Sequence, residues 1–434
     1  MRCRLPLLLL CLLLFACRQP DAATPVAPNE QWQSDMVTTS PPATPPPPHP
    51  LTSSPPHLLT PTPAPSPSPA HPFTPSPAPS PTPSFPAYTG PPLRRHLIGI
   101  QVHLMDRDQD EIFSHLAALG VGWVKVQVSW KLYEPEPGQL HQGRFAELDA
   151  FVNRANALGL QVLLGVSKAP EWSRPTTEMD GPPSDFALYE RFMHTLAARY
   201  QGRVAAYELW NEPNLQREWN GFPLGGAAFV ELLQAGAAGA SAADPDAMLI
   251  AGAPAVTGIN DRVTAVDDRL FLQEMLQAGV ADLVDAIGIH PYGYGNPPDS
   301  TAVQPSLLTH SHNNHPSFFF ADTLSDYRRL LAESGADLPL WVTEFGWGSF
   351  ENVAMAPPDE ATFMADVNEW QQAVYTLRAF EMGQTGARIG PMILWNLNFG
   401  PLLGTEFPES GYSLLRPDGT KRPLYFSLAA APKG

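Results

Sequence analysis

The chain has 434 residues, 51 of which are proline, and its formal net charge is −17 at neutral pH. Three Lys or Arg and three Asp or Glu precede Arg94, so 23 of the 26 basic and 40 of the 43 acidic residues lie from Arg94 onward. This acidic excess argues against nucleic acid or an anionic membrane surface as a partner. It is compatible with a neutral ligand.

The first 17 residues are typical of a targeting segment. Arginines precede an apolar run from Leu5 to Ala16, which is too short to span a bilayer as a permanent helix. The residues LFAC at 14–17 resemble a bacterial lipobox, in which Cys17 would be lipidated and become the mature N-terminus. The sequence therefore predicts a lipoprotein anchored at the extracellular face of a membrane. The alternative, cleavage at an ordinary secretory site, predicts a secreted protein.

Residues 18–93 are predicted to form a disordered linker. Residues 36–93 contain no Asp, Glu, Lys or Arg, and 23 prolines fall within 41–92. Proline alternating with small residues cannot bury a core and favours extended polyproline II. We interpret the segment as a semi-rigid stalk, with a floppy linker as the alternative.

Residues 94–434 have the composition of one globular domain, and short β-rich runs recur along them. These runs are 97–103, 123–130, 160–166, 204–210, 248–253, 284–290, 338–344 and 390–396. Amphipathic segments that are typical of helices lie between them, at 144–158, 185–200, 227–243, 267–278, 321–334 and 360–383. Alternation of this kind implies parallel strands joined by right-handed crossovers. Eight such units predict a closed (β/α)8 TIM barrel.

Functional groups of such a barrel gather where its strands end. The predicted ends are rich in chemically active side chains: His103, Ser129, Trp130, Ser167, Lys168, Asn211, Glu212, Pro254, His290, Tyr292, Glu344, Trp395 and Asn396. We expect these residues to form one site. Tryptophans at or near strand ends, Trp130 and Trp172 among them, are candidates for sugar subsites, with core packing as the alternative.

Glu212 and Glu344 are predicted to face each other across the barrel mouth. Two such carboxylates can cleave a glycosidic bond, because one protonates the leaving oxygen while the other attacks the anomeric carbon. The acid needs a raised pKa, which we expect the negative charge of the other carboxylate to supply.

The stretches YELWNEPN (207–214) and LWVTEFGW (340–347) resemble the acid/base and nucleophile motifs of the clan A retaining glycoside hydrolases. The first is closest to the family 39 β-xylosidases and the family 5 cellulase-like enzymes, and the resemblance covers about residues 97–400. It implies that Glu212 is the acid/base and that Glu344 is the nucleophile. It further implies that Asn211 holds the sugar 2-hydroxyl, that His290 and Tyr292 orient the carboxylates, and that Trp395 forms the floor under the sugar.

The second strand departs from this pattern. Many clan members carry an arginine there that supports the nucleophile, whereas this chain has Lys125 and Gln127. Glu208 has the same strand parity as Glu212 and, on an extended strand, would lie roughly 13 Å deeper in the barrel. Because a buried charge left alone is costly, we predict that Glu208 pairs with Lys125 inside the barrel.

The sequence predicts neither a metal nor another cofactor. The stretch THSHNNH at 309–315 has three histidines, but it lies in a predicted loop without acidic or cysteine partners. All three cysteines precede residue 18. We interpret the loop as one wall of a cleft, with a structural metal as the alternative.

These observations predict a monomeric glycosidase that acts on a neutral polysaccharide or oligosaccharide. It would contact the membrane only through the lipid anchor. Two alternatives remain open at this level: a catalytically silent barrel that binds glycan, and a transglycosylase that uses the same residues. The sugar, the linkage and the choice between endo and exo action are not predicted.

Overall fold

The computed structural model describes residues 85–105, 107–307, 315–353, 355–404 and 407–434. The predicted signal peptide, Cys17 and most of the predicted linker lie outside these residues. None of the helices in the described ranges combines the length and the apolar composition that a membrane span requires.

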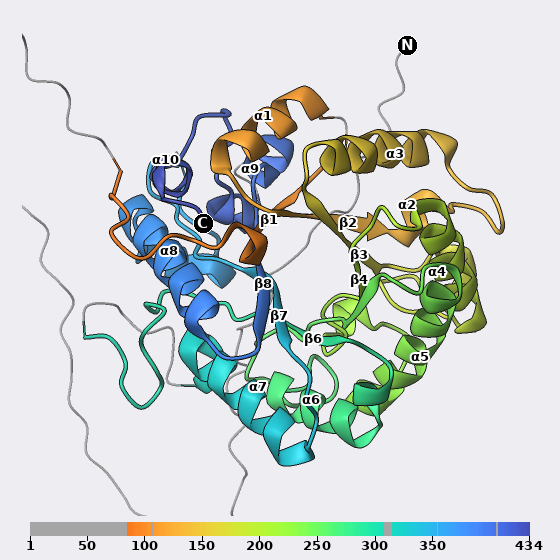
Figure 1. The fold of residues 1–434 in the computed structure, drawn as a ribbon. Coiled ribbons are helices and arrows are strands. Elements are labelled where there is room, and N and C mark those ends of the chain that lie inside the picture. The colour runs from red at the N-terminus through yellow and green to blue at the C-terminus, as the bar shows by residue number, and fades with distance from the viewer. Residues whose placement is uncertain (1–84, 106, 308–314, 354, 405–406) are drawn as a thin grey trace, which may run out of the picture. The chain divides into compact units, whose positions relative to one another are not determined.

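Eight parallel strands form a closed barrel in the order β1 to β8, with β1 paired to β8. Helices surround the strands, as Figure 1 shows along the barrel axis. The strands are β1 Ile98–Val102, β2 Trp123–Ser129, β3 Gln161–Ser167, β4 Ala206–Leu209, β5 Met248–Ala251, β6 Ala286–Ile289, β7 Leu340–Phe345 and β8 Ile389–Leu394. The predicted TIM barrel is confirmed.

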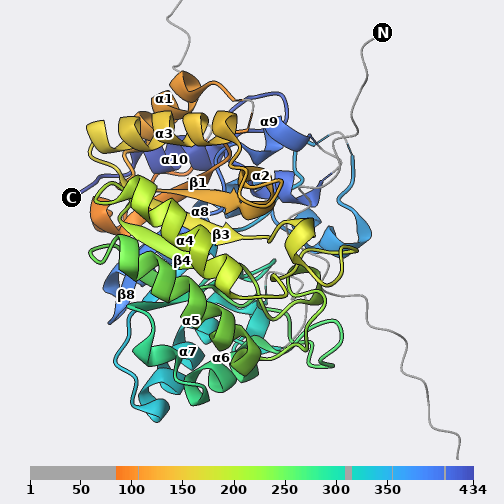
Figure 2. The same ribbon diagram turned by 90° about the vertical axis from the view of Figure 1, so that its right-hand side faces the viewer.

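The helices cover the outside of the barrel (Figure 2). They are α1 Gln109–Leu119, α2 Trp130–Tyr133, α3 Gln142–Ala157, α4 Ala187–Tyr200, α5 Gly226–Ala243, α6 Asp268–Gln277, α7 Phe320–Ser334, α8 Glu369–Thr385, α9 Phe399–Leu403 and α10 Pro423–Ala430. The prediction of one helix over 360–383 was wrong at its start. Asp359–Ala365 is a 3-10 turn, and α8 begins after Asn368, whose side chain forms a capping box with Gln371.

The barrel interior is layered. Strands β2 to β8 each contribute one residue to an apolar layer: Trp123, Leu163, Ala206, Ile250, Ala286, Trp341 and Ile393. Because side chains alternate along a strand, the next inward positions lie two residues further along. On β2, β4 and β7 these are Lys125, Glu208 and Thr343, all fully buried. A polar layer thus lies between the apolar layer and the strand ends.

Residues 85–93, which the sequence analysis assigned to the linker, pack against the C-terminal part of the chain. The ring of Phe85 stacks on Phe426 at 5.6 Å, and Ser427 Oγ donates a hydrogen bond to the carbonyl of Pro86 at 2.7 Å. Leu93 is fully buried and pairs with Lys433 as an isolated β-bridge. Packed structure therefore begins before the predicted domain boundary at residue 94.

Candidate active site

Glu344 lies on β7 at the mouth of the barrel and is 3% exposed. Its Oε1 lies 3.1 Å from Lys125 Nζ, and its Oε2 accepts a hydrogen bond from the Tyr292 hydroxyl, also at 3.1 Å. With its amide oriented to match its neighbours, Gln101 on β1 donates to Glu344 Oε1 at 3.1 Å and accepts from Trp395 Nε1 at 3.2 Å. Three donors, one of them cationic, thus surround the two oxygens of this carboxylate.

Glu212 follows β4 in an unusual backbone conformation. Trp210 and Glu212 have φ values of 81° and 44°, which residues with a side chain rarely adopt. Two hydrogen bonds hold this turn in place. Trp210 N donates to Val166 O on β3 at 2.9 Å, and Glu212 N donates to Ala253 O after β5 at 3.0 Å. A left-handed residue held this firmly is a common feature of functional sites.

The Glu212 carboxylate is 1% exposed and has two basic neighbours. His290 Nδ1 lies 3.2 Å from Oε1, and Arg217 Nη2 lies 3.0 Å from Oε2. Burial raises the pKa of Glu212, but the hydrogen bond from His290 and the charge of Arg217 outweigh burial and hold this pKa below its ordinary value. The expectation that the second carboxylate raises this pKa is therefore wrong for the free enzyme.

Glu208 lies in the polar layer and is close to one partner of each carboxylate, Lys125 for Glu344 and His290 for Glu212. Its Oε2 lies 2.7 Å from Lys125 Nζ, which confirms the predicted buried pair. Its Oε1 accepts from Thr343 Oγ1 at 2.6 Å and lies 3.8 Å from His290 Nε2. Glu208 and Glu212 thus face opposite nitrogens of one imidazole. The predicted depth of roughly 13 Å assumed an extended chain, but the strand ends at Leu209 and the chain then turns through its left-handed residues.

Both bridging groups remain cationic more readily than they would in water. Burial lowers the pKa of Lys125, but the charges of Glu208 and Glu344 outweigh it and raise the pKa. Burial likewise lowers the pKa of His290, and Glu344 and Glu212 reverse this effect and raise it. The site is therefore an alternating chain of charges, with Lys125 and His290 each lying between carboxylates.

Residues 87–381 match the family model described as cellulase (glycosyl hydrolase family 5). This chain belongs to glycosyl hydrolase family 5. It is therefore a member of a family of glycoside hydrolases. No curated protein matches the chain.

Solved structures of other glycoside hydrolases share the fold of this hydrolase. A family 39 enzyme from the gut symbiont Bacteroides cellulosilyticus WH2 has a TM-score of 0.58 at 21% identity, over 78% of this chain and 63% of that one. GH5_18 from Streptomyces cattleya, in complex with GlcNAc, has a TM-score of 0.54 at 18% identity, over 78% and 80%. An exo-β-1,4-mannosidase from Opitutaceae bacterium strain TAV5 has a TM-score of 0.51 at 17% identity, over 80% and 61%. The hydrolase thus spans less than two thirds of the first and third of these chains.

Asn211 and Trp395 lie beside the carboxylates of the hydrolase. Asn211 is 1% exposed, and neither its amide oxygen nor its amide nitrogen has a hydrogen-bond partner among the described residues. An unpartnered buried amide of this kind is available to a ligand. Trp395 is 1% exposed, and its ring packs against Phe399 and Tyr412, each at 5.5 Å between centroids.

The remaining predicted substrate contacts are not grouped with the carboxylates. His103 lies at the end of β1, where its backbone N–H donates to Asn398 Oδ1 at 2.9 Å. Trp130 is fully buried and stacks on Phe192 of α4 at 5.0 Å, which is a packing position between the barrel and its helices. Trp172 donates from Nε1 to the Glu134 carbonyl at 3.1 Å and lies edge-on to Trp130. Of the two interpretations that the sequence left open for Trp130, its full burial and its stacking on Phe192 support core packing.

Sequence reasoning missed two residues of the site. Gln101 precedes His103 by two residues and shares its face of β1, so strand alternation could have indicated it. Arg217 is five residues beyond Glu212, and only the turn after β4 brings it back to the carboxylate. No sequence pattern signals such a contact.

No group of three or more His, Cys, Asp or Glu side chains in the described part of the chain is arranged to hold a metal ion. Of the histidine-rich stretch at 309–315, only His315 lies among the described residues, and its Nδ1 accepts from the Ser317 N–H at 3.3 Å.

Proposed function

We propose that this hydrolase cleaves O-glycosidic bonds of a neutral polysaccharide or oligosaccharide by a retaining, double-displacement mechanism. Glu344 is the nucleophile and Glu212 is the acid/base. The observation that carries the proposal is that the two carboxylates at the ends of β4 and β7 have different partners, which suit different roles.

The surroundings of Glu344 support its role as nucleophile. Lys125, Tyr292 and Gln101 all direct donors at its oxygens. In the first step a carboxylate oxygen of Glu344 attacks the anomeric carbon and forms a glycosyl ester, while the bond to the leaving oxygen breaks. The donors hold the carboxylate of Glu344 in one orientation for this attack.

The position of Glu212 supports its role as acid/base. In its protonated form it donates a proton to the leaving oxygen, and as a carboxylate it then removes a proton from the water that hydrolyses the ester. His290 contacts Glu212 Oε1, so it holds the carboxyl group in one orientation through both steps. The unpartnered amide of Asn211 is available to a sugar hydroxyl during this cycle.

Two variants test these assignments. Glu344→Gln should abolish turnover of aryl glycosides and of natural substrates, because no ester can form. Glu212→Ala should reduce kcat/KM on substrates with poor leaving groups by about 10²- to 10⁴-fold. In Glu212→Ala, formation of the glycosyl ester should remain fast when the leaving group is a good one. Azide should then restore the breakdown of the ester, with formation of a glycosyl azide.

The matched control is Glu190→Gln, which neutralises an exposed glutamate on α4 and should retain full activity. Full activity of Glu344→Gln would sink the nucleophile assignment. The experiment begins with a panel of aryl glycosides and polysaccharides that identifies the sugar. Product analysis on the same panel separates hydrolysis from transglycosylation.

We also propose that Cys17 is lipidated and holds the enzyme at the extracellular face of a membrane. The lipobox-like residues at 14–17 and the proline-rich stretch that follows support this proposal. Cys17→Ser should release the enzyme from the membrane fraction of expressing cells. Unchanged membrane association of that variant would rule out the anchor.

A further inference from the structure

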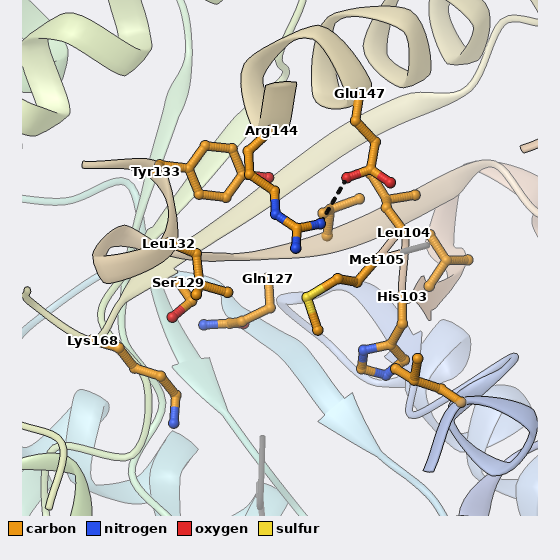
Figure 3. Close-up of a pocket in the computed structure, with 13 residues that line it drawn as sticks. His103, Leu104, Met105, Gln127, Ser129, Leu132, Tyr133, Arg144, Glu147 and Lys168 are labelled. Carbon is orange, nitrogen blue, oxygen red and sulfur yellow. Dashed lines mark hydrogen bonds and ion pairs between the residues drawn. The ribbon is translucent and has the colours of Figure 1, made fainter. Parts of the chain in front are cut away.

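A cavity that is open to solvent lies at the ends of β1, β2 and β3. Figure 3 shows Gln127 from β2, Leu132 from α2 and Met105 from the loop after β1 around the same space. Six of the thirteen lining residues form an apolar wall: Val102, Leu104, Met105, Val126, Leu132 and Leu402. The three charged lining residues are engaged in ion pairs, Arg144 with Glu147 and Lys168 with Asp180. An apolar wall with a few polar groups is typical of a small-molecule site.

Three polar atoms among the lining residues have no hydrogen-bond partner in the described part of the chain. They are His103 Nε2, Gln127 Oε1 and Ser129 Oγ, each shielded from solvent. His103 is 7% exposed and Ser129 is 4% exposed. Buried polar groups are normally satisfied, so the two that can donate, His103 Nε2 and Ser129 Oγ, indicate an acceptor that arrives with a ligand.

His103 and Ser129 can both donate to that group. Burial, reinforced by the charge of Arg107, lowers the pKa of His103 to about 3, so its ring is neutral at ordinary pH. A neutral imidazole has one N–H donor, and the Ser129 hydroxyl has another. Two donors beside an aliphatic wall suit one acceptor oxygen that is attached to a short alkyl group.

The cavity shares two strands of the barrel with residues that contact Glu344. Gln101 and Lys125, which contact Glu344, each lie two residues before a cavity residue: His103, which directly follows β1, and Gln127 on β2. Glu212 and Arg217 follow β4 instead. A substrate bound across the mouth would therefore direct its glycone side, which becomes bonded to Glu344, toward this cavity.

We propose that the cavity binds an acyl substituent on the glycone side of the substrate, so that the preferred substrate is an O-acetylated glycan. The acyl carbonyl oxygen accepts from Ser129 Oγ and His103 Nε2, and the methyl group packs on Leu132 and Met105. A bare pyranose suits the cavity less well, since among its described lining residues the only six-membered aromatic ring is that of Tyr133, which is 7% exposed. This inference rests on the proposed function.

The test compares acetylated xylan and glucomannan oligosaccharides with the same mixtures after mild alkaline deacetylation. The wild-type enzyme should have a kcat/KM at least tenfold higher on the acetylated form of the mixture that it cleaves. Leu132→Gln and Ser129→Ala should each reduce this ratio severalfold. Because both forms are measured with one enzyme preparation, partial misfolding lowers both rates and leaves the ratio unchanged.

Leu158→Gln is the matched control, since Leu158 is 51% exposed at the end of α3 and does not line the cavity. It should keep the wild-type ratio. Equal or faster cleavage of the deacetylated form would overturn the acyl proposal while the cleavage itself upheld the proposed function. The acyl proposal would also be overturned if both cavity variants kept the wild-type ratio of kcat/KM on the acetylated form to kcat/KM on the deacetylated form. If neither form were cleaved, the proposed function would fail on these glycans, and equal affinity for the two forms in calorimetry would overturn the acyl proposal as well.

Discussion

At the scale of single residues, His290 and Arg217 together lower the pKa of Glu212, the proposed acid/base. A general acid must carry a proton, yet Arg217 and His290 both favour the ionised form of Glu212. Arg217 is 23% exposed at its side chain, whereas His290 is fully buried, so Arg217 is the partner that a bound substrate can displace. Binding of the leaving group would then raise the pKa of Glu212 at the moment when its proton is needed.

Replacing Arg217 should therefore move the pH profile. In Arg217→Met the carboxylate loses a cation, so its pKa in the free enzyme rises and Glu212 keeps its proton to higher pH. The basic limb of kcat/KM against pH should shift upward by about one pH unit. Arg329→Met, which removes an exposed arginine on α7, is the control and should leave the profile unchanged. A basic limb at the wild-type position in Arg217→Met would contradict this account.

At the scale of elements, the polar layer joins β2, β4, β6 and β7 inside the barrel. Lys125 on β2 contacts both Glu208 on β4 and Glu344 on β7, and His290 after β6 contacts Glu212. Gly165 on β3 leaves room for this layer, because a Cβ there would lie 3.2 Å from Lys125 Cε. One lysine thus has two functions: it neutralises a buried structural charge and it supports the proposed nucleophile.

A double-mutant cycle separates these functions. Lys125→Met leaves Glu208 buried without its cation and should lower the free energy of unfolding by about 3–5 kcal/mol. Adding Glu208→Gln removes the unpaired charge and should restore part of that stability, measured by urea unfolding. Activity should stay low in the double variant, because Glu344 has still lost its lysine. Recovery of both stability and activity would show that Lys125 has only a structural function.

At the scale of the whole molecule, the first described residues are hydrogen-bonded to the last residues of the chain and to α8. Leu93 N donates to Pro432 O at 2.8 Å, Gly434 N donates to Leu93 O at 2.9 Å, and Arg94 N donates to the Gln384 side chain on α8 at 2.9 Å. Residues 85–93 are therefore part of the folded unit, although their composition matches the proline-rich segment before them.

Two truncations test where the folded unit begins. A chain that starts at residue 85 keeps the Phe85, Pro86 and Leu93 contacts and should unfold like the full-length protein. A chain that starts at residue 94 lacks Leu93, so the surface that packs against this side chain becomes exposed. This chain should lose about 2 kcal/mol or more of unfolding free energy. The comparison is made by thermal and urea unfolding of both chains. Equal stability would place the boundary at 94, as the composition alone predicts.

The sequence by itself was sufficient to predict the barrel, the order of its eight strands and the positions of Glu212 and Glu344 at strand ends. These features depend on local hydrophobic periodicity and on the order of the segments, and both can be determined from one sequence. Alternation along the strands also predicted the buried pair of Lys125 and Glu208, because both the parity of a residue and the cost of an unpaired buried charge can be argued without coordinates.

Only the tertiary structure decided which groups meet. The contact between Arg217 and Glu212 depends on left-handed residues after β4, and the position of Gln101 beside Glu344 depends on the closure of β1 against β8. Trp130 illustrates the same limit, since a tryptophan at a strand end can face the mouth or the helices and only packing determines which. Pairwise contacts between distant residues depend on register and loop conformation, and neither leaves a periodic signal in the sequence.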